Sequence, residues 1–137
     1  MQTFLPLPDF EASAKVLDRQ RLGKQRVEAR QILRALLFGG GWRNHPAVVM
    51  WEGHIAALIE YSNAVIREWI RQGYNNTMPL LRVERATLQP WFGFDALHAS
   101  HRSNLLRKLP EHYGQFGWEE GPDLPYYWPK VEDGRGD

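Results

Sequence analysis

Residues 18–37 read DRQRLGKQRVEARQILRALL, and this stretch carries the pattern that decides the fold. Asp18 is a typical N-cap residue, because its side chain can accept a hydrogen bond from the first turn of a helix. The glycines at residues 39–41 are expected to end that helix. At 100° per residue its apolar side chains share one arc, which is the face expected to meet a core. The members of this arc are Leu22, Ala29, Ile32, Leu33 and Leu36.

Similar patterns predict helices on both sides of this one. Asp9 can cap a short helix over residues 10–18. From about residue 46 to residue 72, apolar side chains recur at spacings of three and four, and Gly53 is expected to divide this segment into a short and a long helix. Another helix is expected over residues 94–108. Nothing in the sequence indicates a hairpin, so the predicted class is all-α, with three main helices and several short ones.

The remaining segments are expected to lack regular structure. Two prolines favour an extended chain over residues 1–9, and two more interrupt residues 74–93. The last quarter is rich in Gly, Pro and aromatic residues, and we expect it to pack on the helices as an ordered coil. Its aromatic rings can also stack on nucleic-acid bases. The prediction is a single domain of residues 1–130 with a flexible tail over residues 131–137.

Composition narrows the class of protein. The chain has 137 residues, of which 43% are apolar, and this supports a packed globule rather than a disordered chain. The net charge is only +1, so any nucleic-acid role depends on where the charges lie. There is no Cys, no apolar run of the roughly 18 residues that span a bilayer, and no basic region before the first apolar residues. These features favour a cytoplasmic protein without a membrane partner.

The long predicted helix is strongly cationic. Arg21, Lys24 and Glu28 are three and four residues apart, so they lie in one stripe. A Lys that precedes Glu gives the weaker order of pair, worth about 0.2–0.5 kcal/mol at best. The stripe is either a solvated face or a phosphate-binding surface in which one carboxylate has a chemical role. The cations around Glu28 are Arg19, Arg21, Lys24, Arg26, Arg30 and Arg34.

The chain start offers a second reactive group. An α-amino group usually has a pKa of about 7.7–8.0, so more of it is neutral at pH 7 than of a lysine side chain. Such an amine can attack a sugar C1′ and displace a base, and a nearby carboxylate can then move protons and stabilise the cationic imine. The alternative is an ordinary frayed terminus.

The histidines allow several interpretations. His45 precedes Pro46 and suits a cap or loop position. His98 and His101 lie three apart on one predicted helix, but no acidic ligand follows at a matching spacing, so we expect no metal site. Ser, His and Arg side chains around Arg102 can either hold phosphates or serve the fold.

Four short motifs, in this order and spacing, resemble the pyrimidine-dimer DNA glycosylase family of the endonuclease V type. They are LGKQRVE at residues 22–28, NHP at 44–46, RQGY at 71–74 and PEHYGQFG at 110–117. The resemblance covers roughly residues 1–117. It implies a single all-α domain whose N-terminal amine is the nucleophile, and it places the catalytic carboxylate at Glu28.

The resemblance also implies how individual residues act. Val27 stands where the family usually has Arg, so Arg26 or Lys24 is expected to supply that charge. Gln2 is large, and removal of the first Met requires a small second residue, so the expected nucleophile is the amine of Met1. The residues expected to contact DNA are Arg21, Lys24, Arg26, Arg30, His45, His101 and Arg102, the last two because they fall where the family places a phosphate-contacting Arg.

The sequence therefore predicts a DNA-repair glycosylase with abasic-site lyase activity. The expected partner is double-stranded DNA with damaged bases such as pyrimidine dimers, and the expected protein is a nucleoid-associated monomer that needs no cofactor. Two alternatives stay open. One is a non-catalytic nucleic-acid-binding module on the same fold, and the other is a helical protein-interaction domain.

Overall fold

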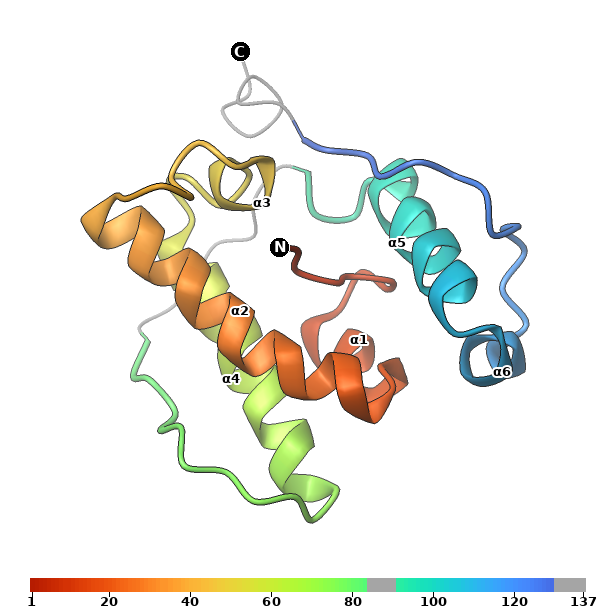
Figure 1. Ribbon diagram of the computed structural model, residues 1–137, viewed down its shortest axis with the longest axis horizontal. Helices are drawn as coiled ribbons and strands as arrows, with labels where there is room; N and C mark the ends of the chain where they lie inside the picture. Colours follow the sequence, from red (N-terminus) through yellow and green to blue (C-terminus); the bar gives the residue numbers. More distant parts are fainter. Residues whose placement is uncertain (84–90, 130–137) are drawn as a thin grey trace.

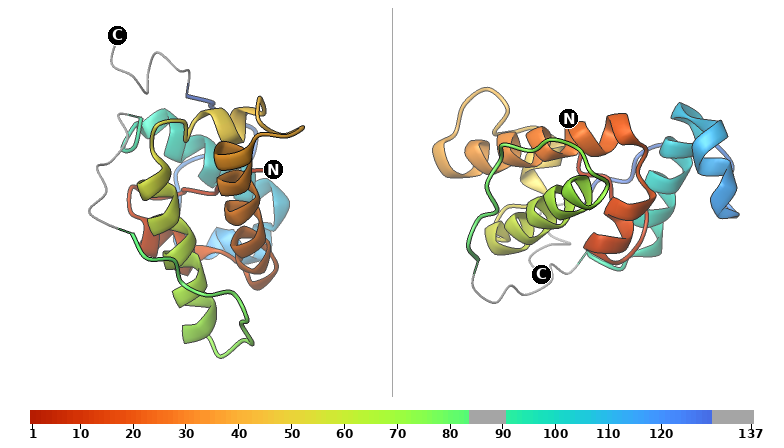
Figure 2. Two further views of the ribbon diagram at one scale, coloured as in Figure 1. Left: turned by 90° about the vertical axis from the view of Figure 1, so that its left-hand side faces the viewer. Right: turned by 90° about the horizontal axis from the view of Figure 1, so that it is seen from below.

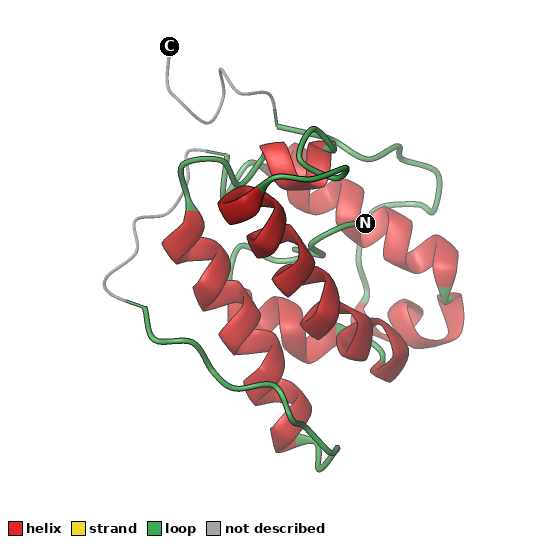
Figure 3. Ribbon diagram, turned by 60° about the vertical axis from the view of Figure 1, so that its left-hand side comes forward, coloured by secondary structure: helices red, strands yellow, loops and turns green. Residues whose placement is uncertain are grey.

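The structure is a computed structural model that describes residues 1–83 and 91–129. Across these residues it contains helices and loops but no strand (Figure 3), which confirms the predicted all-α class. The predicted tail over residues 131–137 and part of the irregular segment 74–93 lie outside the described residues. No helix in the described ranges has the length and apolar character needed to cross a membrane. The helices are α1 (Phe10–Val16), α2 (Arg19–Phe38), α3 (Pro46–Val49), α4 (Ile55–Arg71), α5 (Asp95–Lys108), α6 (Pro110–Tyr113) and the 3-10 helix η1 (Gly114–Phe116).

Helix α2 packs along α4, and this pair forms one side of the molecule (Figures 1 and 2). Leu22, Ala29 and Ile32 of the predicted arc have no exposed surface, so the arc meets the core as expected. Gly23 allows the close approach of the two helices, because a Cβ there would lie 3.1 Å from Cζ3 of Trp69.

The predicted helix ends are close to the observed ones. The Asp18 side chain accepts a hydrogen bond from the backbone N–H of Arg21, so it caps α2 as expected. The division at Gly53 is also confirmed, because α3 ends before this residue and α4 begins after it. Residues 110–116 were expected to be coil but form α6 and η1, with Pro110 in the first turn, where its missing N–H costs nothing.

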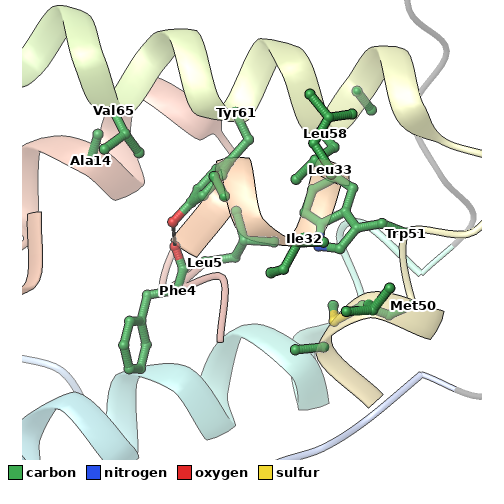
Figure 4. Packing of buried hydrophobic residues seen from close by; sticks show 14 of the residues in the cluster. Phe4, Leu5, Ala14, Ile32, Leu33, Met50, Trp51, Leu58, Tyr61 and Val65 are labelled. Carbon is green, nitrogen blue, oxygen red and sulfur yellow. Dashed lines mark hydrogen bonds between the residues drawn. The ribbon is translucent and has the colours of Figure 1, made fainter. Parts of the chain in front are cut away.

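The chain start runs through the middle of the molecule, between the α2–α4 pair and α5 (Figure 1). Residues 2–6 are buried although they have no regular structure. Their backbone groups are therefore paired with side chains, as buried polar groups require. The Tyr61 hydroxyl, for example, points at the Phe4 carbonyl at 2.9 Å (Figure 4).

Two histidines of α5 hold the backbone of Leu5. Nε2 of His98 accepts a hydrogen bond from Gly93, so its proton lies on Nδ1, which is 2.7 Å from the Leu5 carbonyl. Nδ1 of His101 accepts from the Leu5 N–H at 2.9 Å, so this ring carries its proton on Nε2. Both rings are therefore neutral, and they fix the path of the chain start.

This arrangement predicts a loss of stability in mild acid. Burial, together with the neighbouring His98, lowers the pKa of His101 from the usual 6.5 to about 3. Below pH 6.5 the unfolded chain therefore binds more protons than the folded protein. The free energy of unfolding then falls by about 1.4 kcal/mol for each unit by which the pH is lowered. Between pH 7 and pH 5 we expect His101 to account for a loss of about 2 kcal/mol, measured by urea unfolding.

The carboxylates with lowered pKa values, such as Glu68 and Glu120, keep their contribution to the free energy of unfolding until the pH falls below this range of pH 7 to pH 5. His101→Asn keeps an acceptor for the Leu5 N–H and removes the titrating group. If this variant has the same slope between pH 7 and pH 5 as the wild type, His101 is not the source of the acid sensitivity.

The aromatic last quarter packs on the helices, as predicted. Tyr113 and Trp118 stack with ring centroids 5.8 Å apart, and Tyr126 lies edge-on to His101 at 5.9 Å. These rings cover the ends of the chain start and of α5. The aromatic rings in the described part of this coil therefore pack mainly against the core. One of them, Tyr126, also lines the cavity described next.

Candidate active site

Met1 and Glu28 line the same cavity, which has a volume of about 290 Å³. Glu28 comes from the middle of α2, and Met1 arrives along the buried chain start. The other residues that line the cavity are Gln2, Phe4, Gln20, Arg21, Lys24, Gln25, Lys108 and Tyr126. The chain start, α2 and the end of α5 thus all contribute residues to one site.

Spacing along α2 explains why so many of its residues reach the cavity. Arg21, Lys24 and Glu28 share a stripe at intervals of three and four residues, and all three line the cavity. Gln20 and Gln25 flank this stripe. The carboxylate and the cations of the stripe therefore face the same space.

Gln25 connects the chain start to the carboxylate. Its Oε1 accepts a hydrogen bond from the Phe4 N–H at 2.9 Å and, with the Phe4 carbonyl, shares the single proton of the Tyr61 hydroxyl, which lies 2.6 Å away. Its Nε2 donates to the Gln2 carbonyl and to Oε2 of Glu28, both at 2.9 Å. All four hydrogen-bonding positions of this amide are used, so the side chain can adopt only one orientation. Gln25 therefore fixes the carboxylate relative to residues 2–4.

Further contacts hold the chain start in place beside the cavity. Oγ1 of Thr3 accepts from the indole N–H of Trp51 at 3.0 Å, deep in the core. Gln2 is buried and its Oε1 accepts from the Thr3 N–H at 2.8 Å. Met1 itself is half-buried, at the end of this fixed segment.

His45, a predicted DNA contact, does not line the cavity. Its Nδ1 accepts from the Ala47 N–H at 3.0 Å and caps α3, as the sequence indicates. Burial and, after it, the positive charge of the chain N-terminus lower the pKa of His45, so the ring favours its neutral form. Its ring also contacts Trp42 and Trp128, with centroids 5.7 and 6.0 Å away.

The rim of the cavity is cationic. Arg21 is partly neutralised, because its Nη1 lies 3.2 Å from Oδ1 of Asp18. Lys108 is exposed at the end of α5, and its pKa is lowered by partial burial and by the positive charges of Arg21, Arg107 and Lys24. Arg21, Lys24 and Lys108 line the cavity together, and positive charges gathered in one place favour an anion. The rim can therefore hold phosphate groups.

Arg26 and Arg30 do not line this cavity, although the sequence predicts them as DNA contacts. The Arg26 guanidinium lies over the Trp69 ring, 4.3 Å from its centroid, and donates to Oδ1 of Asn76 at 2.8 Å. Arg30 donates to the Ser62 hydroxyl and to the Pro79 carbonyl. Both guanidinium groups are thus engaged with α4 and with the segment that follows it.

The predicted DNA contacts at His101 and Arg102 need correction. His101 has no exposed surface and binds the chain start, so its ring cannot reach a phosphate. The Arg102 guanidinium binds both carboxylate oxygens of Glu120, at 2.7 and 2.8 Å, and donates to the Pro6 carbonyl. The Ser, His and Arg cluster serves the fold, because α5 packs on a chain start that is 96 residues away in sequence.

Sequence reasoning missed Gln25 and Lys108. Gln25 is a polar residue between Leu22 and Ala29 on the apolar arc, and a polar residue there is the signal that could have revealed it. Lys108 had no such signal, because only the packing of α5 brings it to the cavity. In the described ranges, no group of three His, Asp or Glu side chains is placed to hold a metal ion.

The family model for pyrimidine dimer DNA glycosylase matches residues 1–81, which span the chain start, all of α2 and α4, and most of the cavity. Neither the curated proteins nor the solved structures gave a match.

Proposed function

Because this chain belongs to the pyrimidine dimer DNA glycosylase family, we propose that it excises damaged pyrimidines from DNA with the Met1 amine as nucleophile and Glu28 as the catalytic carboxylate. The observation that supports the proposal is that Met1 and Glu28 line one cavity. They are 27 positions apart in sequence, and the side chain of Gln25 holds Glu28 and the chain start together.

The first step is base release. The neutral amine attacks C1′ of the damaged nucleotide, the C1′–N bond breaks, and the base leaves with the electron pair and takes up a proton. The amine nitrogen then loses a proton, the C1′–O4′ bond of the sugar breaks, and O4′ takes up a proton, which gives a cationic imine between protein and sugar. In this proposal the Glu28 carboxylate stabilises this cation and moves these protons.

The second step is strand cleavage by β-elimination. A base removes a proton from C2′ next to the imine, and the C3′–O bond breaks, so that the 3′-phosphate leaves. Glu28 is suited to take that proton, since Gln25 donates a single hydrogen bond to its Oε2. Water then hydrolyses the imine and frees the amine for the next turnover.

DNA binding is assigned to the rim of the cavity. Arg21, Lys24 and Lys108 surround the reactive groups and are suited to hold phosphates on both sides of the damaged nucleotide. His45, whose pKa is lowered by burial and by the charge of the chain N-terminus, is a further proposed DNA contact. Extrusion of a nucleotide into the site costs a few kcal/mol and is easiest where stacking is already disturbed, as it is at a fused pyrimidine pair.

A salt titration checks the role of Lys108. Each phosphate contact adds about 0.9 to the slope of log Kobs against log salt, so Lys108→Gln is expected to reduce this slope by about 0.9. The matched control is Arg67→Gln, an exposed cation of α4 that does not line the cavity. Equal slopes for Lys108→Gln and the wild type would remove Lys108 from the DNA interface.

The proposed function is tested by borohydride trapping on duplexes with an abasic site or a pyrimidine dimer, together with gel shifts at two salt concentrations. Borohydride reduces the imine, so the proposal predicts a covalent protein–DNA adduct. Salt-dependent binding without an adduct identifies a non-catalytic nucleic-acid-binding module. The absence of both identifies a protein-interaction domain.

A further inference from the structure

Gln2 contributes a buried hydrogen-bond donor that the proposed chemistry does not use. The residue lines the cavity together with Met1 and Glu28, yet only 5% of its surface is exposed. Its Nε2 carries two N–H groups and has no hydrogen-bond partner within the described part of the chain. Buried polar groups are nearly always paired, and a buried donor without a partner costs about 1–3 kcal/mol. An unpaired donor at this cavity therefore calls for an explanation.

The rest of Gln2 is fixed by the fold. Its Oε1 accepts from the Thr3 N–H at 2.8 Å, and its backbone carbonyl accepts from Nε2 of Gln25 at 2.9 Å. Because Oε1 must accept, the amide cannot turn by 180° to exchange its nitrogen and its oxygen. The two N–H groups of Nε2 are thus the part of this side chain that serves no contact in the fold.

These N–H groups belong to the residue that follows the proposed nucleophile. Nε2 is covered in the free protein, and the neighbouring Met1 is the half-buried end of the chain, tethered on one side only. Movement of Met1 toward a sugar C1′ can uncover the Gln2 amide while its contacts to Thr3 and Gln25 persist. The acceptor that this donor would meet is therefore an atom close to C1′.

We propose that the Gln2 amide donates a hydrogen bond to O2 of the pyrimidine that is released, and so stabilises this base as a leaving group. The inference rests on the proposed function. O2 is bonded to the ring atom next to N1, so it lies close to the C1′–N1 bond that breaks. The electron pair of that bond passes to the base and is shared by N1 and O2, where a fixed donor contributes most.

The proposed contact involves no proton transfer, because the amide keeps both of its hydrogens. It acts in base release alone, since an abasic site has no base and therefore no O2. Gln2 thus separates the two steps of the proposed reaction. A loss of its donor should slow the first step and leave the second unchanged.

The test compares two substrates with one variant. Gln2→Met keeps the length of the side chain, has no N–H donor, and still presents a large second residue, so Met1 is retained. Loss of one donor to a developing anion lowers a rate by about 10²- to 10³-fold. Base release from a duplex with a pyrimidine dimer should fall by this factor under single-turnover conditions. Cleavage of a duplex with a preformed abasic site should keep the wild-type rate.

A second variant, Gln2→Glu, guards against an effect on folding. It keeps an oxygen that can accept from the Thr3 N–H, whereas an ionised carboxylate has no hydrogen to donate. Base release should again fall while abasic-site cleavage is retained. The matched control is Gln31→Met, because Gln31 is an exposed glutamine of α2 that does not line the cavity, and this variant is expected to keep both rates.

A wild-type rate of base release in either Gln2 variant overturns the inference. So does an equal fall of base release and abasic-site cleavage, which would assign Gln2 to the positioning of Met1. Failure of the proposed function shows separately, as a wild-type protein that gives no borohydride-trapped adduct on abasic DNA.

Discussion

Replacement of Glu28 by glutamine is expected to lower the rates of base release and strand cleavage by about 10²- to 10⁴-fold, the usual contribution of a general acid–base group. The variant loses the negative charge that would stabilise the imine and accept protons. Its side-chain oxygen can still accept from Nε2 of Gln25, so the geometry of the site is retained. Rates are measured under single-turnover conditions on duplexes with a pyrimidine dimer.

DNA affinity separates this effect from misfolding. Glu28 lies among the cations of the rim, so its neutralisation is expected to leave affinity equal to or above that of the wild type. Glu60→Gln, on α4 and outside the cavity, is the matched control and is expected to retain full activity. A Glu28→Gln variant with an unchanged rate would exclude Glu28 as the catalytic carboxylate.

Replacement of Gln25 by methionine is expected to have the largest effect on stability. The apolar side chain fills a similar volume but leaves the Phe4 N–H and the Gln2 carbonyl without their partner in the core. A buried polar group without a partner costs about 1–3 kcal/mol, so the two groups together predict a loss of about 2–6 kcal/mol in the free energy of unfolding. Urea unfolding measures this loss.

In the Gln25→Met variant, catalytic activity should fall by a larger factor than the fraction of folded protein, because Gln25 also orients Glu28. Gln31→Met is the matched control, since Gln31 is an exposed glutamine on the same helix. If both variants are equally stable and equally active, Gln25 does not connect the chain start to the carboxylate.

The helices were predictable because their signals are local. The apolar arc from Leu22 to Leu36 fixes the buried face of α2, and Asp9 and Asp18 cap the first two helices as their residue type indicates. The stripe of Arg21, Lys24 and Glu28 follows from helical spacing alone. These features need no knowledge of what packs against them.

The tertiary contacts of the site were not predictable in the same way. The family resemblance predicts DNA contacts at His101 and Arg102, but α5 turns them to residues 5 and 6 and to Glu120. The converse holds for Lys108, whose place at the cavity depends on how α5 packs. Residue type indicated the chemistry of these side chains, while the fold determined what they contact.

The central claim concerns which nitrogen forms the imine. Lys24 and Lys108 line the same cavity as Met1, and a lowered pKa makes Lys108 a real competitor. The direct test is to trap the adduct with borohydride on abasic DNA, digest the protein, and locate the modified residue by mass spectrometry. We predict that the sugar remnant is on the α-nitrogen of Met1. A remnant on the side chain of Lys24 or Lys108, or an intact N-terminal peptide with no adduct, would contradict the account.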